Sequence, residues 1–211
     1  MSRATFWNII AKRYARNPVA DQPSYETKLA MTKAILRPQM RVLEVGCGTG
    51  TTALYHAPSV AHIDAIDFSP AMIAVAQGKA DAQAISNVTF RVAALANLPT
   101  NGATYDVALA LSLLHLLDDP AAGLREIADR VKPEGYVVTS TACLGDTGGF
   151  MVRILPWIGK TGLLPKVVPL TKDALIAAHA AAGLQITETF RPRADGSVFL
   201  IAKKTDHQSA A

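Results

Sequence analysis

Glycine occupies positions 46, 48 and 50 in the segment VLEVGCGTG, directly after a short apolar run. Glycine reaches positive φ and lets a ligand approach the backbone, because it has no Cβ. A P-loop needs Lys and then Ser or Thr after its last glycine, but Thr51 and Thr52 follow here, which disfavours ATP hydrolysis. The spacing also departs from the G-x-G-x-x-G of dinucleotide sites. A nucleoside-binding turn is favoured, and a tight turn without a ligand is the structural alternative.

Asp67 is the second residue with chemistry of its own. It lies 17 positions after Gly50 in AIDFSPAMI, at the end of the next predicted strand. A carboxylate at this point accepts hydrogen bonds from both hydroxyls of a ribose. The alternative role is to cap a turn or a helix. The two features together predict a nucleoside site.

A parallel sheet flanked by helices is needed to place these residues together. Short apolar runs alternate with helical segments, which indicates βαβ units. Ser69–Pro70 and Asp119–Pro120 are typical helix starts. The end of the chain instead predicts a helix closed by Gly183 and then an antiparallel hairpin. We expect strands at 41–45, 62–67, 88–93, 105–111, 136–141, 184–192 and 197–204, and helices at 51–57, 69–84, 119–132 and 171–183.

Five motifs across residues 40–141 resemble, in order, those of class I S-adenosylmethionine-dependent methyltransferases. They are VLEVGCGTG, IDFSPAMIAVA, ANLP, YDVALALSLLHLLDDP and LREIADRVKPEGYVV. The resemblance implies a Rossmann-like, doubly wound seven-stranded sheet that is mostly parallel with an antiparallel last strand. It also implies S-adenosylmethionine as cofactor and S-adenosylhomocysteine as product.

His115 lies just past the end of the fourth predicted strand, where a histidine could act as a general base or orient the substrate, and a partly buried histidine hydrogen-bonded to backbone is the alternative. The resemblance assigns roles to other residues, and Tyr25 and Lys28 are further candidates in the N-terminal segment. The family often has an acid that binds adenine where this chain has Ala94, so a backbone N–H or Asn97 would replace it. The cofactor-binding residues implied are Tyr14, Glu44, Gly46, Cys47, Gly48, Gly50, Asp67, Phe68, Met72, Ala94, Leu95, Leu111 and Ser112.

The 211 residues predict one domain, with a composition that is half hydrophobic and 18% charged. We expect an N-terminal helical cover at 1–37, a cofactor-binding core at 38–142, a substrate lid at 143–170, and a final helix and hairpin at 171–204. Two cysteines, no spanning segment and no signal peptide predict a reduced, cytoplasmic protein. The five histidines are dispersed, so no metal site is expected.

Methyl transfer from a sulfonium needs an aligned nucleophile and exclusion of water, rather than a catalytic triad. LSLL stands where amino-methylating enzymes of this fold carry NPPY or DPPY, which favours a small-molecule or lipid acceptor. We expect an apolar or anionic substrate and no nucleic acid, and contact with a membrane surface is an alternative. A cofactor-binding protein without transfer activity and a dehydrogenase are the other function classes. The acceptor atom and the oligomeric state stay open.

Overall fold

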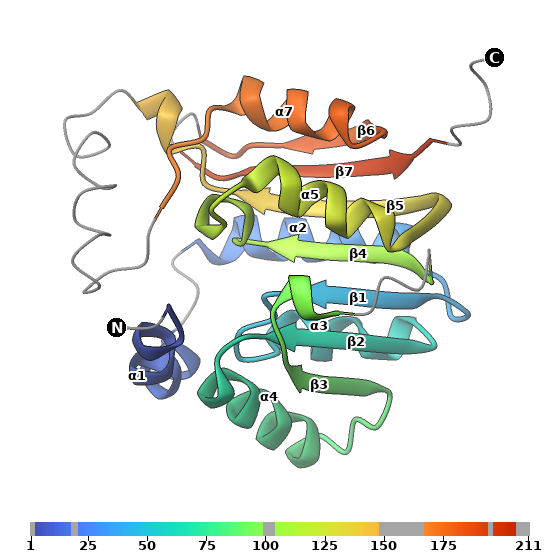
Figure 1. Ribbon diagram of the computed structural model, residues 1–211. Helices are drawn as coiled ribbons and strands as arrows, with labels where there is room; N and C mark the ends of the chain where they lie inside the picture. The colour runs from blue at the N-terminus through green and yellow to red at the C-terminus, as the bar shows by residue number, and fades with distance from the viewer. Residues whose placement is uncertain (1–2, 18–20, 99–103, 148–166, 194–195, 206–211) are drawn as a thin grey trace. The chain divides into compact units, whose positions relative to one another are not determined.

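Seven strands form the sheet of this α/β protein. The computed structural model describes residues 3–17, 21–98, 104–147, 167–193 and 196–205. The strand order is β3-β2-β1-β4-β5-β7-β6, and β7 runs antiparallel to both of its neighbours (Figure 1). The predicted mixed, Rossmann-like sheet is thereby confirmed. The strands are β1 Arg41–Val45, β2 His62–Asp67, β3 Val88–Val92, β4 Tyr105–Leu111, β5 Val131–Thr141, β6 Leu184–Phe190 and β7 Val198–Lys204.

The chain divides into two compact units, Met1–Leu98 and Pro99–Ala211. The first unit holds β1, β2 and β3, which pair in parallel. Its helices are α1 Arg3–Arg16, α2 Gln22–Ile35, α3 Thr51–His56 and α4 Pro70–Ala82, with 3-10 turns at Ala57–Ser59 and Leu95–Asn97. The prediction of one domain with a helical cover and a lid stays a prediction.

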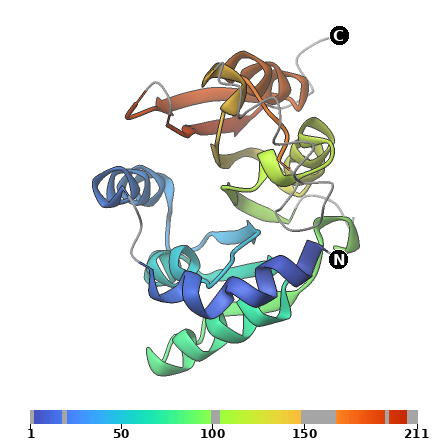
Figure 2. The same cartoon turned by 90° about the vertical axis from the view of Figure 1, so that its left-hand side faces the viewer.

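Helix α4 packs on β2 and β3, and α1 lies alongside α4 (Figure 2). The predicted start of α4 is confirmed, because the Ser69 side chain accepts a hydrogen bond from the Met72 N–H and Pro70 is the first helical residue. This start lies two residues after the end of β2. The β2–α4 connection is therefore short and tightly hydrogen-bonded, which holds Asp67 in place.

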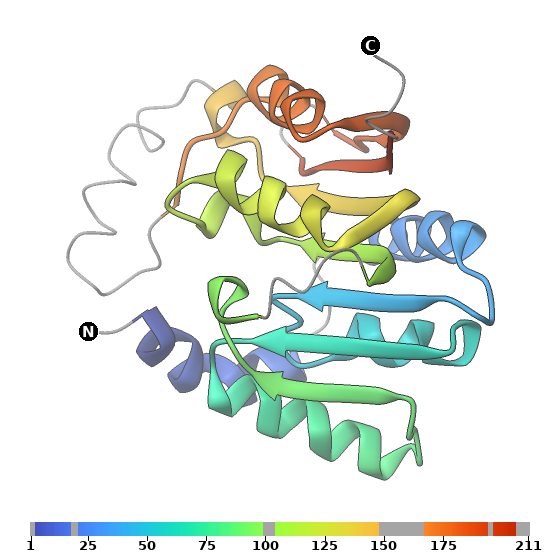
Figure 3. The same cartoon turned by 45° about the vertical axis from the view of Figure 1, so that its right-hand side comes forward.

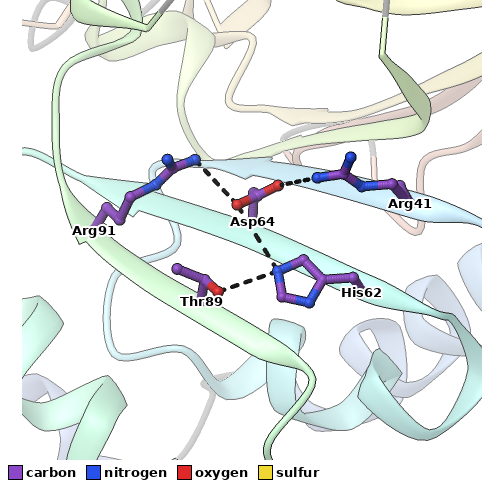
Figure 4. A network of polar contacts seen from close by, with 5 residues as sticks. All are labelled: Arg41, His62, Asp64, Thr89 and Arg91. Carbon is purple, nitrogen blue, oxygen red and sulfur yellow. Dashed lines mark hydrogen bonds and ion pairs between the residues drawn. The ribbon is translucent and has the colours of Figure 1, made fainter.

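An ionic cluster joins the three strands of the first unit (Figure 4). The Asp64 carboxylate lies 3.2 Å from Arg41 of β1 and 3.0 Å from Arg91 of β3, and His62 lies 3.9 Å away. Thr89 and His62 are 3.1 Å apart. Asp64 and Asp67 are three positions apart on one strand, so their side chains point to opposite faces of the sheet. The cluster supports strand pairing, away from the face that carries Asp67.

The second unit contains β4 to β7, with α5 Pro120–Asp129 and α7 Lys172–Ala181 side by side on its strands (Figure 3). Gly183 follows α7 with φ of 68°, as expected of a glycine that closes a helix. Short 3-10 turns follow β4 at Leu114–Leu116 and β5 at Leu144–Thr147. Residues 198–202 of β7 are buried on both faces, which suits a strand with a neighbour on each side.

The predicted helix at 119–132 is too long, and the strand predicted at 136 begins earlier. Helix α5 ends at Asp129, and β5 already begins at Val131, which pairs with Tyr105. The pairing register then shifts before Tyr136, and Glu134 takes a φ of 64° within the irregularity. An early pairing followed by a bulge is not visible in the local sequence pattern.

Candidate functional site

The glycine turn between β1 and α3 has the left-handed backbone that its residues predict. Gly46, Gly48 and Gly50 have φ of 72°, 53° and 74°. The N–H groups of Gly46 and Cys47 both donate to the Ile66 carbonyl, at 2.8 and 3.0 Å. These two bonds hold the turn against the end of β2, next to Asp67.

The last two glycines serve different purposes. A Cβ on Gly50 would lie 2.7 Å from Ala76 Cβ and 2.8 Å from a ring carbon of Phe90, so Gly50 allows close packing of the turn on α4 and β3. A Cβ on Gly48 would meet nothing within 4 Å. Gly48 therefore leaves open space above the turn, where a bound molecule can approach the backbone.

Asp67 is held by backbone hydrogen bonds to both oxygens. The Ser69 N–H donates to Oδ1 at 2.8 Å, and the Gly48 N–H donates to Oδ2 at 3.0 Å. Burial raises the pKa of this carboxyl, and the two backbone hydrogen bonds oppose the rise. A carboxylate has about four lone-pair sites, so each oxygen can still accept one hydroxyl. The oriented pair of acceptors matches the two hydroxyls of a ribose.

Glu44 is a buried acid with an unused oxygen. Its side chain is in the core, and Oε2 has no hydrogen-bond partner in the part of the chain that the structure describes. Burial and, less strongly, the charge of Asp67 together raise the pKa of Glu44 to about 8, against a backbone hydrogen bond from Ala53. A cation placed beside this oxygen would favour the ionised form. The same surroundings raise the pKa of the Cys47 thiol, which therefore is no nucleophile at neutral pH.

Two residues outside the predicted set also hold this region. The Lys79 ammonium on α4 donates to the hydroxyls of Thr49 at 3.1 Å and Thr51 at 2.9 Å, which ties the turn to α4. Asn8 of α1 accepts from the Ser69 hydroxyl at 2.6 Å. Asn8 is the one polar residue in the run FWNII, and that interruption was the available sequence signal.

The candidate residues of the N-terminal helices, Tyr14, Tyr25 and Lys28, differ in how far they are buried. Tyr14 is 54% exposed at the end of α1. The Tyr25 hydroxyl lies 3.2 Å from Thr52 Oγ1 on α3, and burial, together with the charge of Glu44, raises its pKa. Burial also lowers the pKa of Lys28, and Asp21 opposes this. Tyr25 is thus the tyrosine that the structure brings close to the turn.

The residues assigned to the adenine follow β2 and β3. Phe68 is partly exposed, whereas Met72 is only 2% exposed and belongs to the core under α4. Ala94 is exposed and starts the 3-10 turn, and Leu95 after it is buried. Asn97, the considered substitute for the missing acid, is exposed. These five positions stay predictions as ligand contacts, and Met72 would have to act from within the core.

In the second unit, one predicted residue, Leu111, ends β4 and two more follow it. Ser112 takes a φ of 56°, unusual for a residue with a Cβ, while its N–H donates to the Ser140 carbonyl at 2.7 Å. The Leu111 side chain is half-buried. His115 lies on the 3-10 turn after β4, and burial lowers its pKa. Its Nδ1 has no partner among the described residues, so a neutral imidazole is available as a proton acceptor.

The first-unit residues fit an S-adenosyl group by their own chemistry. Asp67 presents two oriented acceptors, Gly48 leaves room over the backbone, and Glu44 keeps an unpaired buried oxygen for a cationic centre. No group of three or more His, Cys, Asp or Glu side chains that could hold a metal occurs in the described parts of the chain.

Comparison with known proteins agrees with this fit. Residues 42–135 match a family described as a methyltransferase domain. The chain is 33% identical over 147 residues to a ubiquinone biosynthesis O-methyltransferase of Xylella fastidiosa, covering 69% of this chain and 58% of that protein. It is 31% identical over 175 residues to a protein of the same name from Xanthomonas axonopodis, covering 82% and 69%. The chain thus spans little more than half of the first relative.

A solved structure supports the fold separately. That of the [4+2]-cyclase SpnF gives a TM-score of 0.73 at 21% identity, and the match covers 90% of this chain and 85% of that one. Together the relatives confirm the expected family and its enzyme class. The chain belongs to the class I S-adenosylmethionine-dependent methyltransferases.

Proposed function

We propose that this chain transfers a methyl group from S-adenosylmethionine to a hydroxyl oxygen of a small molecule. The observation that carries the proposal is the Asp67 carboxylate, held by the Gly48 N–H beside the open space over the turn, with the buried unpaired oxygen of Glu44 in the strand before it. The relatives named as O-methyltransferases support oxygen as the acceptor atom. When bound, the cofactor supplies a methyl group on positively charged sulfur, which needs no further activation.

The residues of the first unit bind and orient. Asp67 accepts both ribose hydroxyls while its own oxygens stay fixed by the N–H groups of Gly48 and Ser69. Glu44 compensates positive charge in a region from which water is excluded, where electrostatic attraction is stronger than in bulk water. Catalysis then comes mainly from holding the acceptor in line with the methyl group, since orientation lowers the barrier without a covalent intermediate on the protein.

His115 is the proposed proton acceptor for the substrate hydroxyl. Its lowered pKa keeps the imidazole neutral at physiological pH, so the ring can receive the proton. Its backbone is fixed, because the Val168 N–H donates to the His115 carbonyl at 2.8 Å. Replacing His115 with glutamine should lower kcat and change the pH profile, while the affinity for the cofactor stays the same.

Two measurements test the proposal in order. Calorimetry with S-adenosylmethionine and S-adenosylhomocysteine first establishes binding, and Asp67→Ala should weaken it. Asp173→Ala is the matched control, because Asp173 is an exposed acid in the first turn of α7. Transfer of a labelled methyl group to a panel of phenols and other hydroxyl compounds then tests turnover. Absence of cofactor binding by the wild-type protein would refute the proposal.

Binding without turnover would instead support a protein that holds the cofactor but does not transfer its methyl group. The fold is compatible with that outcome, since the similar SpnF structure is described as a cyclase. The lack of an acid at position 94 was the sequence reason for considering it. Binding of NADH without binding of S-adenosylmethionine would point to a dehydrogenase.

A second candidate is methylation of an amphipathic acceptor at an anionic membrane surface. Helix α1 has no acid, ends with Arg13 and Arg16, and exposes 72% of Ile9. Phe6 and Trp7 form an edge-to-face pair on the same helix, with ring centroids 5.3 Å apart. Basic residues beside exposed apolar ones are typical of helices that lie in a membrane interface. The predicted lid falls largely at 148–166, outside the described residues.

Vesicle co-sedimentation distinguishes this candidate. Vesicles that contain phosphatidylglycerol should bind the protein at low salt, and Ile9→Ser should weaken binding more than Ile176→Ser. Ile176 is also an exposed isoleucine on a helix, 36% exposed on α7. Equal sedimentation of both variants would contradict a role for α1. In the described residues, no helix is long and apolar enough to cross a membrane, so this contact would be peripheral.

A further inference from the structure

Asn8 on α1 connects the N-terminal helix to the Asp67 carboxylate through one serine. The Ser69 hydroxyl donates to Asn8 Oδ1 at 2.6 Å, and the Ala71 N–H donates to the same oxygen at 3.3 Å. The Ser69 N–H in turn donates to Asp67 Oδ1 at 2.8 Å. One side-chain oxygen of α1 is therefore a single residue away from the carboxylate that would hold the ribose.

We infer that Asn8 is a positioning residue for the cofactor, and that docking of α1 and binding of the adenosine moiety strengthen each other. The inference rests on the proposed function, because it takes Asp67 as the acceptor of the ribose hydroxyls. Asn8 itself touches Ser69 and the backbone of Ala71, so it acts through them.

The hydrogen bonds of Ser69 explain how the effect reaches Asp67. Ser69 is fully buried, and its hydroxyl accepts from the Met72 N–H at 3.2 Å while it donates to Asn8. Without Asn8, this buried hydroxyl has to find another acceptor. Asp67 Oδ1, which already binds the Ser69 N–H, is an acceptor on the same turn. A second bond from Ser69 there would occupy a lone pair that a ribose hydroxyl needs.

The two bonds to Asn8 give the docking of α1 its specificity. Apolar contact is also present, because Ala11 is buried and Phe6, Trp7 and Ile10 are half-buried, whereas Ile9 is 72% exposed. Apolar contact is non-directional, so the paired hydrogen bonds to Asn8 determine how the helix is placed. By linkage, a ligand that prefers the docked form must favour docking by the same factor.

Calorimetry with S-adenosylhomocysteine tests the inference without depending on turnover. Asn8→Ala should weaken binding about tenfold, as expected for about 1.4 kcal/mol. Asn8→Asp retains the acceptor oxygen and should stay within about threefold of the wild type. Asn17→Ala is the matched control, since Asn17 is an exposed asparagine that directly follows α1. In a Ser69→Ala background, Asn8→Ala should have a much smaller effect than in the wild type, because the connecting hydroxyl is gone and only the Ala71 N–H still donates to Asn8.

Hydrogen exchange supplies a second readout on the wild-type protein. S-adenosylhomocysteine should slow exchange of the amides of α1, and Asn8→Ala should remove that protection while the far-ultraviolet circular dichroism stays the same. Wild-type binding with an unchanged affinity in Asn8→Ala, or with no protection of α1, would overturn the inference alone. Failure of the wild-type protein to bind the ligand would overturn the proposed function as well.

Discussion

Replacing Glu44 with glutamine tests the electrostatics of the turn. Burial and the nearby Asp67 raise the pKa of this carboxyl from 4.5 to about 8. A raised pKa in the folded state means that the native protein prefers the protonated acid. The contribution of Glu44 to the free energy of unfolding is therefore most favourable below pH 4.5 and falls as the pH rises towards 8. Linkage between these two pKa values gives a loss of about 3 kcal/mol at pH 7.

Glutamine has nearly the same shape but cannot ionise, so Glu44→Gln should lack this loss. Urea unfolding measured across pH 4.5 to 8 tests this. Relative to the wild type, the free energy of unfolding of the variant should increase by about 3 kcal/mol between pH 4.5 and pH 7. Glu188→Gln, which changes an exposed glutamate on β6, is the control. Its free energy of unfolding should change with pH in the same way as that of the wild type. Parallel curves for Glu44→Gln and the wild type would refute the reasoning.

Glu44→Gln should raise stability but weaken binding of the cofactor. Positive charge beside the unpaired Oε2 lowers the pKa of Glu44, so binding of S-adenosylmethionine at pH 7 should release close to one proton. Calorimetry in buffers of different ionisation enthalpy counts that proton. Glu44→Gln should release none and bind more weakly, even though it is the more stable protein. Equal proton release by both proteins would contradict the prediction that the positive charge of the cofactor lies beside Glu44.

Four further predictions concern single positions. Gly50→Ala should lower the free energy of unfolding by about 2 to 3 kcal/mol in urea titrations, because its Cβ would clash with Ala76 at a positive φ. Gly48→Ala has open space, so it should cost about 1 kcal/mol but weaken cofactor binding by calorimetry. Burial and the charge of Lys33 lower the pKa of the fully buried His56 to about 4, so stability should fall by about 3 kcal/mol from pH 6.5 to 4, and His56→Gln should flatten that decline. Ala94→Asp should raise the affinity for S-adenosylmethionine about fivefold, the effect of one added hydrogen bond to adenine, and an unchanged calorimetric Kd would contradict the assignment of this loop.

Local patterns predicted most of the secondary structure correctly, for reasons that act within a few residues. Ser69 and Pro70 start α4 as expected, since capping needs only the side chain and the next turn. Glycines at 46, 48 and 50 all take positive φ. The failure came at Val131, where pairing with Tyr105 extends β5 into a segment with a helical pattern. A partner 26 residues earlier leaves no trace in the local sequence.

Some residues of the candidate site could be recognised from the sequence, whereas others could be found only in the structure. The motifs around Gly48 and Asp67 identify the family's cofactor from sequence, because their residue types and spacing are set by the ligand. The contributions of Asn8 and Lys79 were missed, since each acts through atoms that lie 61 and 30 positions away. No sequence periodicity links Asn8 to Ser69 or Lys79 to Thr49. Packing of α1 on α4 brings the first pair together, and packing of α4 beside the glycine turn brings the second pair together.

From its order of residues alone, this chain specifies a mixed α/β sheet, a glycine turn with an acid at the end of the next strand, and the family to which both belong. Those features depend on local backbone preference and on alternation of apolar residues, which neighbouring positions determine. Burial, in contrast, is a property of the folded chain. It leaves Glu44 with an unpaired oxygen and a pKa of about 8, and it turns the Ser69 hydroxyl towards Asn8. The charge state of the turn and its connection to α1 therefore arise only when distant segments exclude water together.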